Sequence, residues 1–262
     1  MTPPPRFGVQ SWCFRDTRDN AVLAEKVRSI GLDKIELCDV HGDFSKPGEF
    51  RAVMETYRSR GVSIVSLGVQ TFTGTPGERA WFECAAKAGA RHISCHFQID
   101  SYLAAIPCVR QWSREFGVRV GIHCHGGYRF GGSPDVLDHL LTLGGPEIGV
   151  CIDTAWAMQI GPRHGNPIEW VKRYAGRIHG VHFKDFVFGL DGQWKDVVVG
   201  TGTLDLPAFI EALEQNGFDG MSIIECEVDL QNPEPALKQS VEALRMAWLG
   251  SNGKRTPFNS AT

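Results

Sequence analysis

The sequence predicts a single (β/α)8 barrel, because short apolar runs alternate with amphipathic stretches along nearly all of its 262 residues. Strands that alternate with helices in this way are usually parallel and joined by crossover helices. The length suits one such barrel, and no linker or low-complexity stretch divides the chain. An open doubly wound sheet would usually show a glycine-rich turn after its first strand, where this chain has "WCFRDTRDN".

Each predicted strand is a short apolar run followed by a stretch that fits a helix. The strand candidates are residues 7–12, 34–39, 62–69, 92–97, 119–125, 148–153, 178–184 and 221–227. Thr75 and Pro76 with Glu78 have the pattern of an N-cap, a proline in the first turn and a capping-box partner. Further N-caps are expected at Ser133, Asn166 and Asp205.

The chain is expected to form one domain over residues 1–262. The last predicted helix covers about residues 235–248 and is amphipathic. The polar segment from about 250 to 262 is expected to be a flexible tail.

The composition excludes several classes of partner. A net charge of −3 and a pI near 6.3 predict neither nucleic-acid binding nor attraction to an anionic membrane. The sequence contains no run of about 18 apolar residues, which is the length that a helix needs to span a bilayer. The start "MTPPPRFGVQSW" lacks the regions of a signal peptide, so we expect a cytoplasmic location.

The eight cysteines include no CxxC pair and are expected to be reduced, mostly buried thiols.

Ionisable side chains gather at the C-terminal ends of the predicted strands, where barrels of this class carry their reactive groups. These ends carry Glu36, His96, His123, His125, Asp153, His182, Lys184, Glu225 and Glu227. Strand residues two apart share a face, so the pairs on the fifth, seventh and eighth strands each point to one side. In "IHGVHFKDF" the shared face is expected to hold Ile178, Gly180, His182 and Lys184.

Charged groups at the mouth of a barrel need a partner, because burying an unpaired charge is costly. A bound divalent cation would supply it, since imidazoles and carboxylates together are its ligands. Taken singly, each histidine could be a structural residue of the core as readily as a metal ligand. A single glutamate at a strand end is usually exposed to solvent. The succession of His, Asp, His and Glu on strands five to eight is what predicts a metal site.

Several segments resemble one known family. They are "GVQSWCFR", "KIELCDVH", "GIHCHGG", "IGVCIDTAW", "GVHFKDF", "VGTGTLDLPAFIEAL" and "GMSIIECE". The chain resembles, over residues 6–248, the sugar phosphate isomerase/epimerase family with the xylose-isomerase-like TIM barrel. The resemblance implies one divalent metal ion held by His123, Asp153, His182 and Glu225, with Glu227 the rival to the last ligand.

Two positions depart from the family pattern. Ketose 3-epimerases of the family usually carry a glutamate where this chain has His123. The family's inosose-dehydratase-like branches carry a histidine there, as this chain does. Many relatives carry a histidine where this chain has Trp156. Endonuclease IV-type enzymes share the barrel but need further histidines, and the matching positions here are Trp156, Trp194 and Asp196. A DNA nuclease is therefore not expected.

The remaining strand-end residues have predicted roles in catalysis or substrate contact. Glu36, Lys184 and His125 are the candidates for acid/base work and for polarising a carbonyl, and His125 has an ordinary pKa near neutrality. Glu36 fits a structural salt bridge equally well, and Lys184 fits a partner of Asp185 or of a carboxylate inside the barrel. His96, Trp12 and Trp156 are expected to contact substrate.

Three functions follow from these residues. The leading one is a metal-dependent isomerase or epimerase that removes a proton next to a carbonyl of a small sugar or keto-sugar and forms an enediolate. A lyase or dehydratase acting on a keto-inositol or 3-keto-sugar would share the first half of this reaction. A non-catalytic sugar-binding barrel is a third reading. Two imidazole ligands favour Mn²⁺, Co²⁺ or Zn²⁺ over Mg²⁺. The exact substrate and a homo-oligomeric state stay open.

Overall fold

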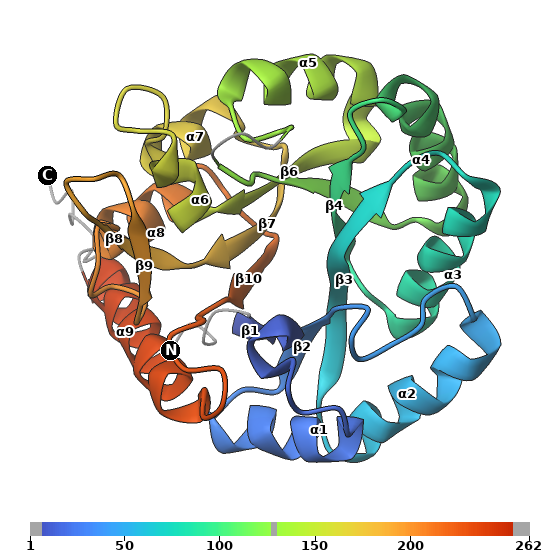
Figure 1. Cartoon of the computed structure of the whole chain (residues 1–262), viewed down its shortest axis with the longest axis horizontal. Coiled ribbons are helices and arrows are strands. Elements are labelled where there is room, and N and C mark those ends of the chain that lie inside the picture. The colour runs from blue at the N-terminus through green and yellow to red at the C-terminus, as the bar shows by residue number, and fades with distance from the viewer. Residues whose placement is uncertain (1–6, 127–129, 254–262) are drawn as a thin grey trace, which may run out of the picture.

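The computed structural model describes residues 7–126 and 130–253, and within them eight parallel strands close into the predicted barrel (Figure 1). In order around the ring, the strands are β1 (Phe7–Gln10), β10 (Met221–Ile224), β7 (Ile178–Phe183), β6 (Ile148–Asp153), β5 (Arg119–His123), β4 (His92–Phe97), β3 (Ser63–Phe72) and β2 (Lys34–Leu37). Every predicted strand is therefore present. Several end two or three residues earlier than predicted, and β3 runs three residues further.

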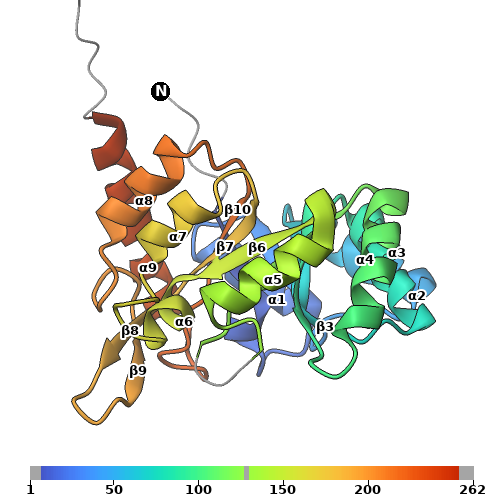
Figure 2. The ribbon, with the colours of Figure 1, turned by 90° about the horizontal axis from the view of Figure 1, so that it is seen from above.

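Helices pack around the outside of the barrel (Figures 1 and 2). They are α1 (Asn20–Ser29), α2 (Pro47–Ser59), α3 (Arg79–Ala88), α4 (Tyr102–Phe116), α5 (Pro134–Gly144), α6 (Thr154–Gln159), α7 (Pro167–Arg173), α8 (Leu206–Gln215) and α9 (Glu234–Gly253). Short 3₁₀ turns occur at η1 (Ser11–Phe14), η2 (Pro76–Glu78) and η3 (Gly145–Glu147). Two helices, α6 and α7, fill the connection between β6 and β7, where one was predicted. The predicted flexible tail overlaps α9 as far as residue 253, and its remainder lies outside the described residues.

Three of the four predicted N-caps are confirmed. The side chains of Ser133, Asn166 and Asp205 accept backbone N–H bonds at the starts of α5, α7 and α8. The cap predicted at Thr75 is wrong, because its side chain caps no helix and the turn η2 precedes α3. Glu78 instead accepts bonds from the backbone N–H groups of Thr73 and Gly74, which fixes the loop before that turn.

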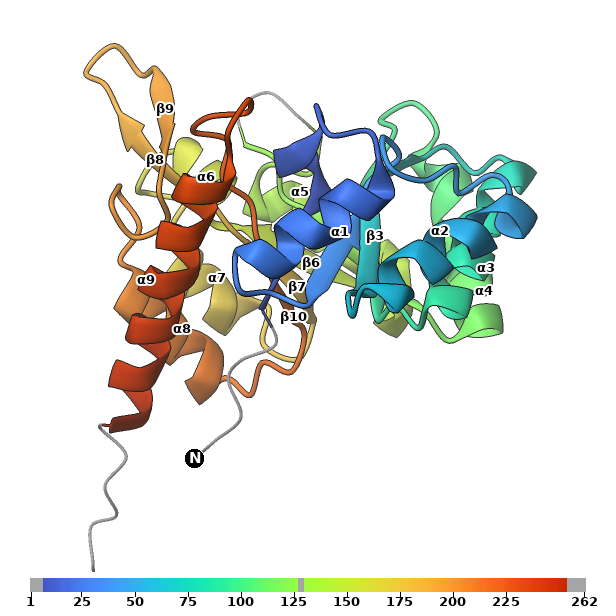
Figure 3. The same ribbon diagram turned by 90° about the horizontal axis from the view of Figure 1, so that it is seen from below.

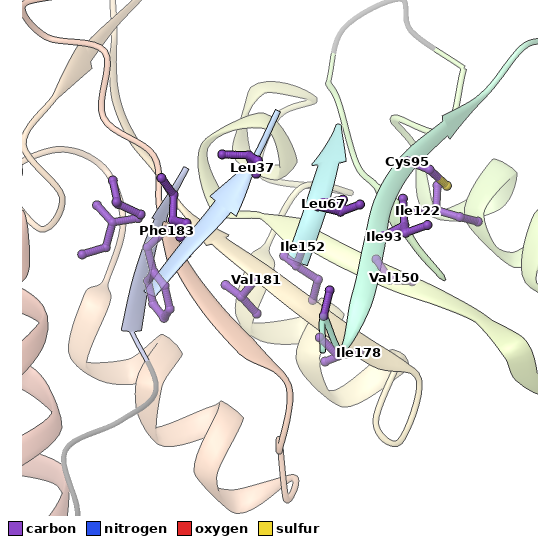
Figure 4. Close-up of a cluster of buried hydrophobic side chains, with 14 of the residues drawn as sticks. Leu37, Leu67, Ile93, Cys95, Ile122, Val150, Ile152, Ile178, Val181 and Phe183 are labelled. Atoms are coloured by element: carbon purple, nitrogen blue, oxygen red, sulfur yellow. The ribbon is translucent and has the colours of Figure 1, made fainter. Parts of the chain in front are cut away.

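The outward-facing strand residues form the apolar layer between barrel and helices. Figure 4 shows part of this layer, including Ile93, Val150 and Val181. The prediction that Ile178 shares the face of Gly180 is wrong. The register between β6 and β7 shifts, so that Val150 pairs with Ile178 but the next residue, Cys151, pairs with Gly180. The extra residue in β7 lets Ile178 join the apolar layer shown in Figure 4.

A hairpin that was not predicted follows β7. Its strands β8 (Asp185–Phe188) and β9 (Trp194–Val197) pair antiparallel, and they project beyond the end of the barrel (Figure 3). Asp185 anchors the return of the chain, because its carboxylate accepts bonds from the backbone N–H groups of Gly200, Gly202 and Leu204. Asp185 is thus committed to this loop and does not pair with Lys184.

Two predictions about the whole chain can be compared with the structure. All eight cysteines lie in the described residues and none forms a disulfide. Among the helices of the described ranges, none combines the length and the apolar character needed to cross a bilayer.

Candidate metal centre and active-site pocket

The four predicted metal ligands meet at the C-terminal end of the barrel. His123 and Asp153 end β5 and β6, His182 lies near the end of β7, and Glu225 directly follows β10. One candidate ligand atom from each residue lies within 4.8 Å of the others, and all four side chains are buried. Parallel strands bring them together, and Asp153 stands directly opposite His182 in the register.

The protein satisfies the polar atoms of this cluster only in part. Neither ring nitrogen of His123 hydrogen-bonds to a described residue, and the same holds for Oδ2 of Asp153. Asp153 uses Oδ1 to accept the backbone N–H of Trp156 at the start of α6, at 2.9 Å. Its Oδ2 lies 3.4 Å from Nε2 of His123. Buried polar atoms without partners are rare in folded proteins.

The polar atoms of His123 and Asp153 that lack a hydrogen-bond partner among the described residues are available to bind a metal ion. Two imidazoles and two carboxylates form a donor set that suits divalent transition ions. On the opposite side of the cluster, Nδ1 of His182 lies 2.9 Å from Oε2 of Glu225. The residues present therefore fit one divalent ion held between His123, Asp153, His182 and Glu225.

Burial sets the protonation of the cluster. Burial and the nearby His182 lower the pKa of His123 to about 3, so its imidazole is neutral, as a metal ligand must be. Burial and the charge of Glu225 raise the pKa of Asp153 to about 7. Burial also disfavours the charged form of Glu225, but the Lys184 ammonium and His182 hold its pKa well below the ordinary range. A bound cation would favour the ionised form of Asp153 in the same way.

Glu36 lies inside the barrel, behind His182, and is fully buried. Its Oε1 is 2.8 Å from Nε2 of His182 and 2.7 Å from the side-chain amide of Gln10, and its Oε2 accepts the Ser94 hydroxyl at 3.0 Å. Burial opposes ionisation, but the charge and hydrogen bond of His182 lower the pKa of Glu36 to about 2. Glu36 is among neither the metal-cluster residues nor the residues that line the pocket.

Lys184 follows β7 on the side of His182 and is 1% exposed. Its Nζ lies 3.0 Å from Oε1 of Glu225 and 3.5 Å from Oδ1 of Asp196, and it also pairs with Glu227. The lysine therefore balances the charge of three carboxylates, one of them a candidate metal ligand.

A cavity of about 260 Å³ opens above the cluster, and His123 and Glu225 form part of its floor. All three residues predicted to contact substrate, His96, Trp12 and Trp156, line this cavity, and so does His125. The rings of His125 and Trp156 stack with centroids 3.9 Å apart. Aromatic and imidazole faces thus make up one wall of the pocket.

The structure places further residues in the site, among them Glu227, which the sequence had indicated only as a rival metal ligand. Glu227 lines the pocket and forms a salt bridge of 2.8 Å to Arg15, whose guanidinium lies over the Trp12 ring. Cys38, at the end of β2, lines the pocket as well. The hairpin supplies Trp194, whose ring lies 5.5 Å from that of Trp156. The pairing of Lys184 with Glu227 agrees with the expectation that the lysine pairs with a carboxylate inside the barrel, although the sequence did not show which carboxylate.

Comparison with known proteins agrees with this architecture. The sequence model of the family described as "Xylose isomerase-like TIM barrel" matches residues 24–247. The chain belongs to this family. The match covers every strand of the barrel except β1.

Members with assigned activities differ in their chemistry. The chain is 24% identical to 3-oxo-isoapionate decarboxylase of Pectobacterium atrosepticum over 78% of its own length and 76% of the relative's. It is 28% identical to inosose dehydratase of Lacticaseibacillus casei, over 47% of this chain and 45% of that protein. Among solved structures, a D-tagatose 3-epimerase-like protein superposes with a TM-score of 0.74 at 18% identity, covering 96% of this chain and all of the other. The last likeness is one of fold alone.

Proposed function

We propose that this protein is a divalent-metal-dependent isomerase or epimerase that acts on a small sugar or keto-sugar. The observation that carries the proposal is the cluster of His123, Asp153, His182 and Glu225. Polar atoms of His123 and Asp153 in this cluster have no hydrogen-bond partner among described residues, and His123 and Glu225 line a pocket. The family has epimerase, dehydratase and decarboxylase members, which supports an enzyme acting on a small sugar-like molecule.

The proposed chemistry starts with removal of a proton next to a carbonyl. A divalent ion held by His123, Asp153, His182 and Glu225 would act as a Lewis acid, which would polarise the carbonyl and make the neighbouring C–H more acidic. His125 lines the pocket and is the proposed base, because a neutral imidazole accepts a proton near neutral pH. Return of a proton to the neighbouring carbon gives isomerisation, and return to the opposite face of the same carbon gives epimerisation.

Two residues expected to be catalytic take other roles in this proposal. Glu36 is buried behind His182 and holds Nε2 of that ring, so we assign it to positioning the ligand. Lys184 is covered by three carboxylates and is assigned to holding Glu225 and Glu227 in place. Substrate contact is proposed for His96, Trp12 and Trp156, since flat apolar faces suit the C–H face of a sugar.

The ligand set also bears on the metal. Two imidazoles with two carboxylates favour Mn²⁺, Co²⁺ or Zn²⁺, whereas Mg²⁺ prefers oxygen ligands and keeps its waters.

A dehydratase is the second candidate, and a specific observation favours it. The fifth strand provides His123, an imidazole with its pKa lowered to about 3, where a two-carboxylate epimerase would need an acid/base glutamate. After the same proton removal, loss of a β-hydroxyl would need an acid near the leaving oxygen. The likeness to inosose dehydratase points the same way.

Proton NMR in D₂O separates these readings. Metal-loaded protein is incubated with a panel of ketoses, aldoses, keto-inositols and 3-keto-sugars, with chelator-treated protein as the control. An isomerase or epimerase exchanges one substrate proton for deuterium and loses no water, whereas a dehydratase releases an unsaturated product. If no panel member reacts although several bind, the non-catalytic sugar-binding barrel replaces both proposals.

A further inference from the structure

A thiol and an imidazole form a pair at the edge of the pocket, apart from the metal cluster. Cys38 lines the pocket at the end of β2, and its Sγ lies 3.6 Å from Nδ1 of His41. The Ser11 hydroxyl donates to the same sulfur at 3.1 Å, and its oxygen accepts the backbone N–H of Cys38 at 2.8 Å. Both Cys38 and His41 are buried among described residues, so the orientation of the pair is fixed by packing.

The tautomer of His41 follows from its second contact. Nε2 of His41 lies 3.0 Å from the backbone carbonyl oxygen of Thr17. A carbonyl oxygen only accepts hydrogen bonds, so Nε2 carries the ring proton and Nδ1 presents its lone pair to Cys38. Burial raises the pKa of Cys38 and lowers the pKa of His41, so the pair rests as a thiol and a neutral imidazole. The free lone pair of Nδ1 lets the imidazole take up the thiol proton when the thiol reacts.

The position of β2 in the barrel determines on which side of the pocket Cys38 and His41 lie. β2 lies four places from β6 whichever way the ring is followed, so the two strand ends are on opposite sides of the barrel mouth. Trp156, just after β6, stacks on His125. Cys38 and His125 therefore line opposite sides of one cavity.

We propose that Cys38, supported by His41, is the second proton-transfer group of the pocket and acts on the face of the substrate opposite to His125. The inference rests on the proposed function, because proton exchange at a carbon next to a carbonyl needs a donor as well as a base. This chain carries His123 where a two-carboxylate epimerase has an acid/base glutamate. Cys38 would provide the second acid/base group that a reaction on two faces of the substrate needs.

The step balances without another reagent. The S–H bond of Cys38 breaks and a C–H bond forms, using the electron pair of the enediolate carbon–carbon double bond while the carbonyl forms again. The sulfur keeps the S–H electron pair as a thiolate, which the Ser11 hydroxyl stabilises by donating to it. The thiolate then regains a proton from water by way of Nδ1 of His41, and His125 returns to that water the proton that it took from the substrate. In the reverse direction, the thiol proton moves to Nδ1 of His41 and the thiolate takes the C–H proton.

The first arm of the test measures Cys38→Ser and Cys38→Ala in metal-loaded protein, on a sugar that the wild type converts. Conversion should fall by about 100-fold, the scale of a lost acid/base group. Deuterium uptake from D₂O at the reacting carbon should continue, because His125 still exchanges the proton on its own face. Metal content and melting temperature should stay at the wild-type values. Wild-type conversion by Cys38→Ala would overturn the proposal.

The control for this arm is Cys108→Ser, because Cys108 is a half-buried cysteine of α4 outside the pocket. It should convert the sugar at the wild-type rate. Loss of conversion and of deuterium uptake together, with the metal retained, would show that Cys38 is needed for the first proton removal and would overturn its assignment to the opposite face.

The second arm does not depend on knowing the substrate. Iodoacetamide labelling of the folded chain is followed by peptide mass spectrometry at Cys38 and Cys108. His41→Gln keeps a donor for the Thr17 carbonyl but removes the base, so labelling of Cys38 should slow by about 10-fold while that of Cys108 stays unchanged. Equal labelling of Cys38 in both proteins, or no labelling of it, would overturn the pair even if no sugar is converted. If slowed labelling is seen without any sugar turnover, the thiol–imidazole pair stands and the proposed function fails.

Discussion

Glu36 and His182 are 146 residues apart in the sequence, yet Nε2 of His182 lies 2.8 Å from Oε1 of Glu36 in the middle of the barrel. The carboxylate is ionised, so it accepts the Nε2 hydrogen and leaves Nδ1 directed at Glu225 and the metal cluster. Carboxylates in this position fix the tautomer of a ligating histidine and increase its basicity. Glu36, in the barrel interior, thus positions one of the four candidate metal ligands, His182.

Glu36→Gln should weaken metal binding by about 10- to 100-fold, the usual effect of losing such a support. The side chains of Gln10, Ser94 and His182 each donate a hydrogen bond to Glu36, so the amide NH₂ of a glutamine would face a donor. Competition with a chromogenic chelator measures the affinity. Glu83→Gln is the control, because Glu83 is a half-buried residue of α3 that pairs with Lys87 on the outside of the barrel. Unchanged affinity in Glu36→Gln would mean that His182 needs no partner.

Lys184→Met and His182→Ala should separate charge balance from metal binding. His182→Ala removes a ligand and should lose the metal. Lys184→Met keeps the four ligands but leaves Glu227 without its ammonium partner, so kcat/KM should fall by roughly 10- to 1,000-fold, or about 1.4–4 kcal/mol. Metal analysis and steady-state kinetics of both variants check this, with the exposed Lys87→Met as control. Normal turnover in Lys184→Met would assign the lysine to structure alone.

Trp194→Ala should raise KM by about 3- to 10-fold and leave metal affinity unchanged, because an aromatic contact contributes roughly 0.5–1.5 kcal/mol. The Trp194 ring supports Trp156, which in turn stacks on His125. Steady-state kinetics would be compared with Leu190→Ala, since Leu190 lies at the hairpin tip and is fully exposed. Equal KM values in the two variants would show that the hairpin has no part in forming the pocket.

The strands and their inward-facing residues could be predicted because each β/α unit repeats the same apolar pattern. The depth of a side chain in the barrel could not, because depth depends on the stagger between strands, which the sequence of one strand does not contain. Glu36 was therefore expected at the mouth, but it lies below it. The shifted register at Ile178 has the same origin.

The hairpin was missed although a signal for it exists. Asp191 and Gly192 form a dipeptide typical of tight hairpin turns, between segments that alternate in polarity. The segment lies where a barrel of this class normally connects a strand to its helix. A simple loop was therefore expected there, and the hairpin pattern was not recognised. Reading that dipeptide as a turn would have placed Trp194 and Asp196 beside the pocket.

Metal-free protein should lose stability in mild acid through His179. This side chain is buried, donates from Nδ1 to the Val120 carbonyl, and burial lowers its pKa to about 4. In the unfolded chain the imidazole takes up a proton near pH 6.5, so its contribution is present above that pH and is lost as the pH falls toward 4.

Between pH 7 and 4.5 this loss amounts to roughly 2 to 3 kcal/mol in the free energy of unfolding. Urea unfolding of His179→Gln should therefore depend less steeply on pH than that of the wild type. The exposed His164→Gln should follow the wild-type curve. Parallel curves for His179→Gln and wild type would place the acid sensitivity at other residues.

The central claim is that His123, Asp153, His182 and Glu225 hold a divalent ion in this fold. The most direct measurement is the metal content of chelator-stripped protein after titration with Mn²⁺, compared between wild type and Asp153→Ala. We predict about one ion per chain in the wild type, and none retained by a folded Asp153→Ala protein, which lacks the carboxylate oxygen that accepts no hydrogen bond from a described residue. Equal Mn²⁺ content in the two proteins, or a wild-type protein that binds none, would contradict the account.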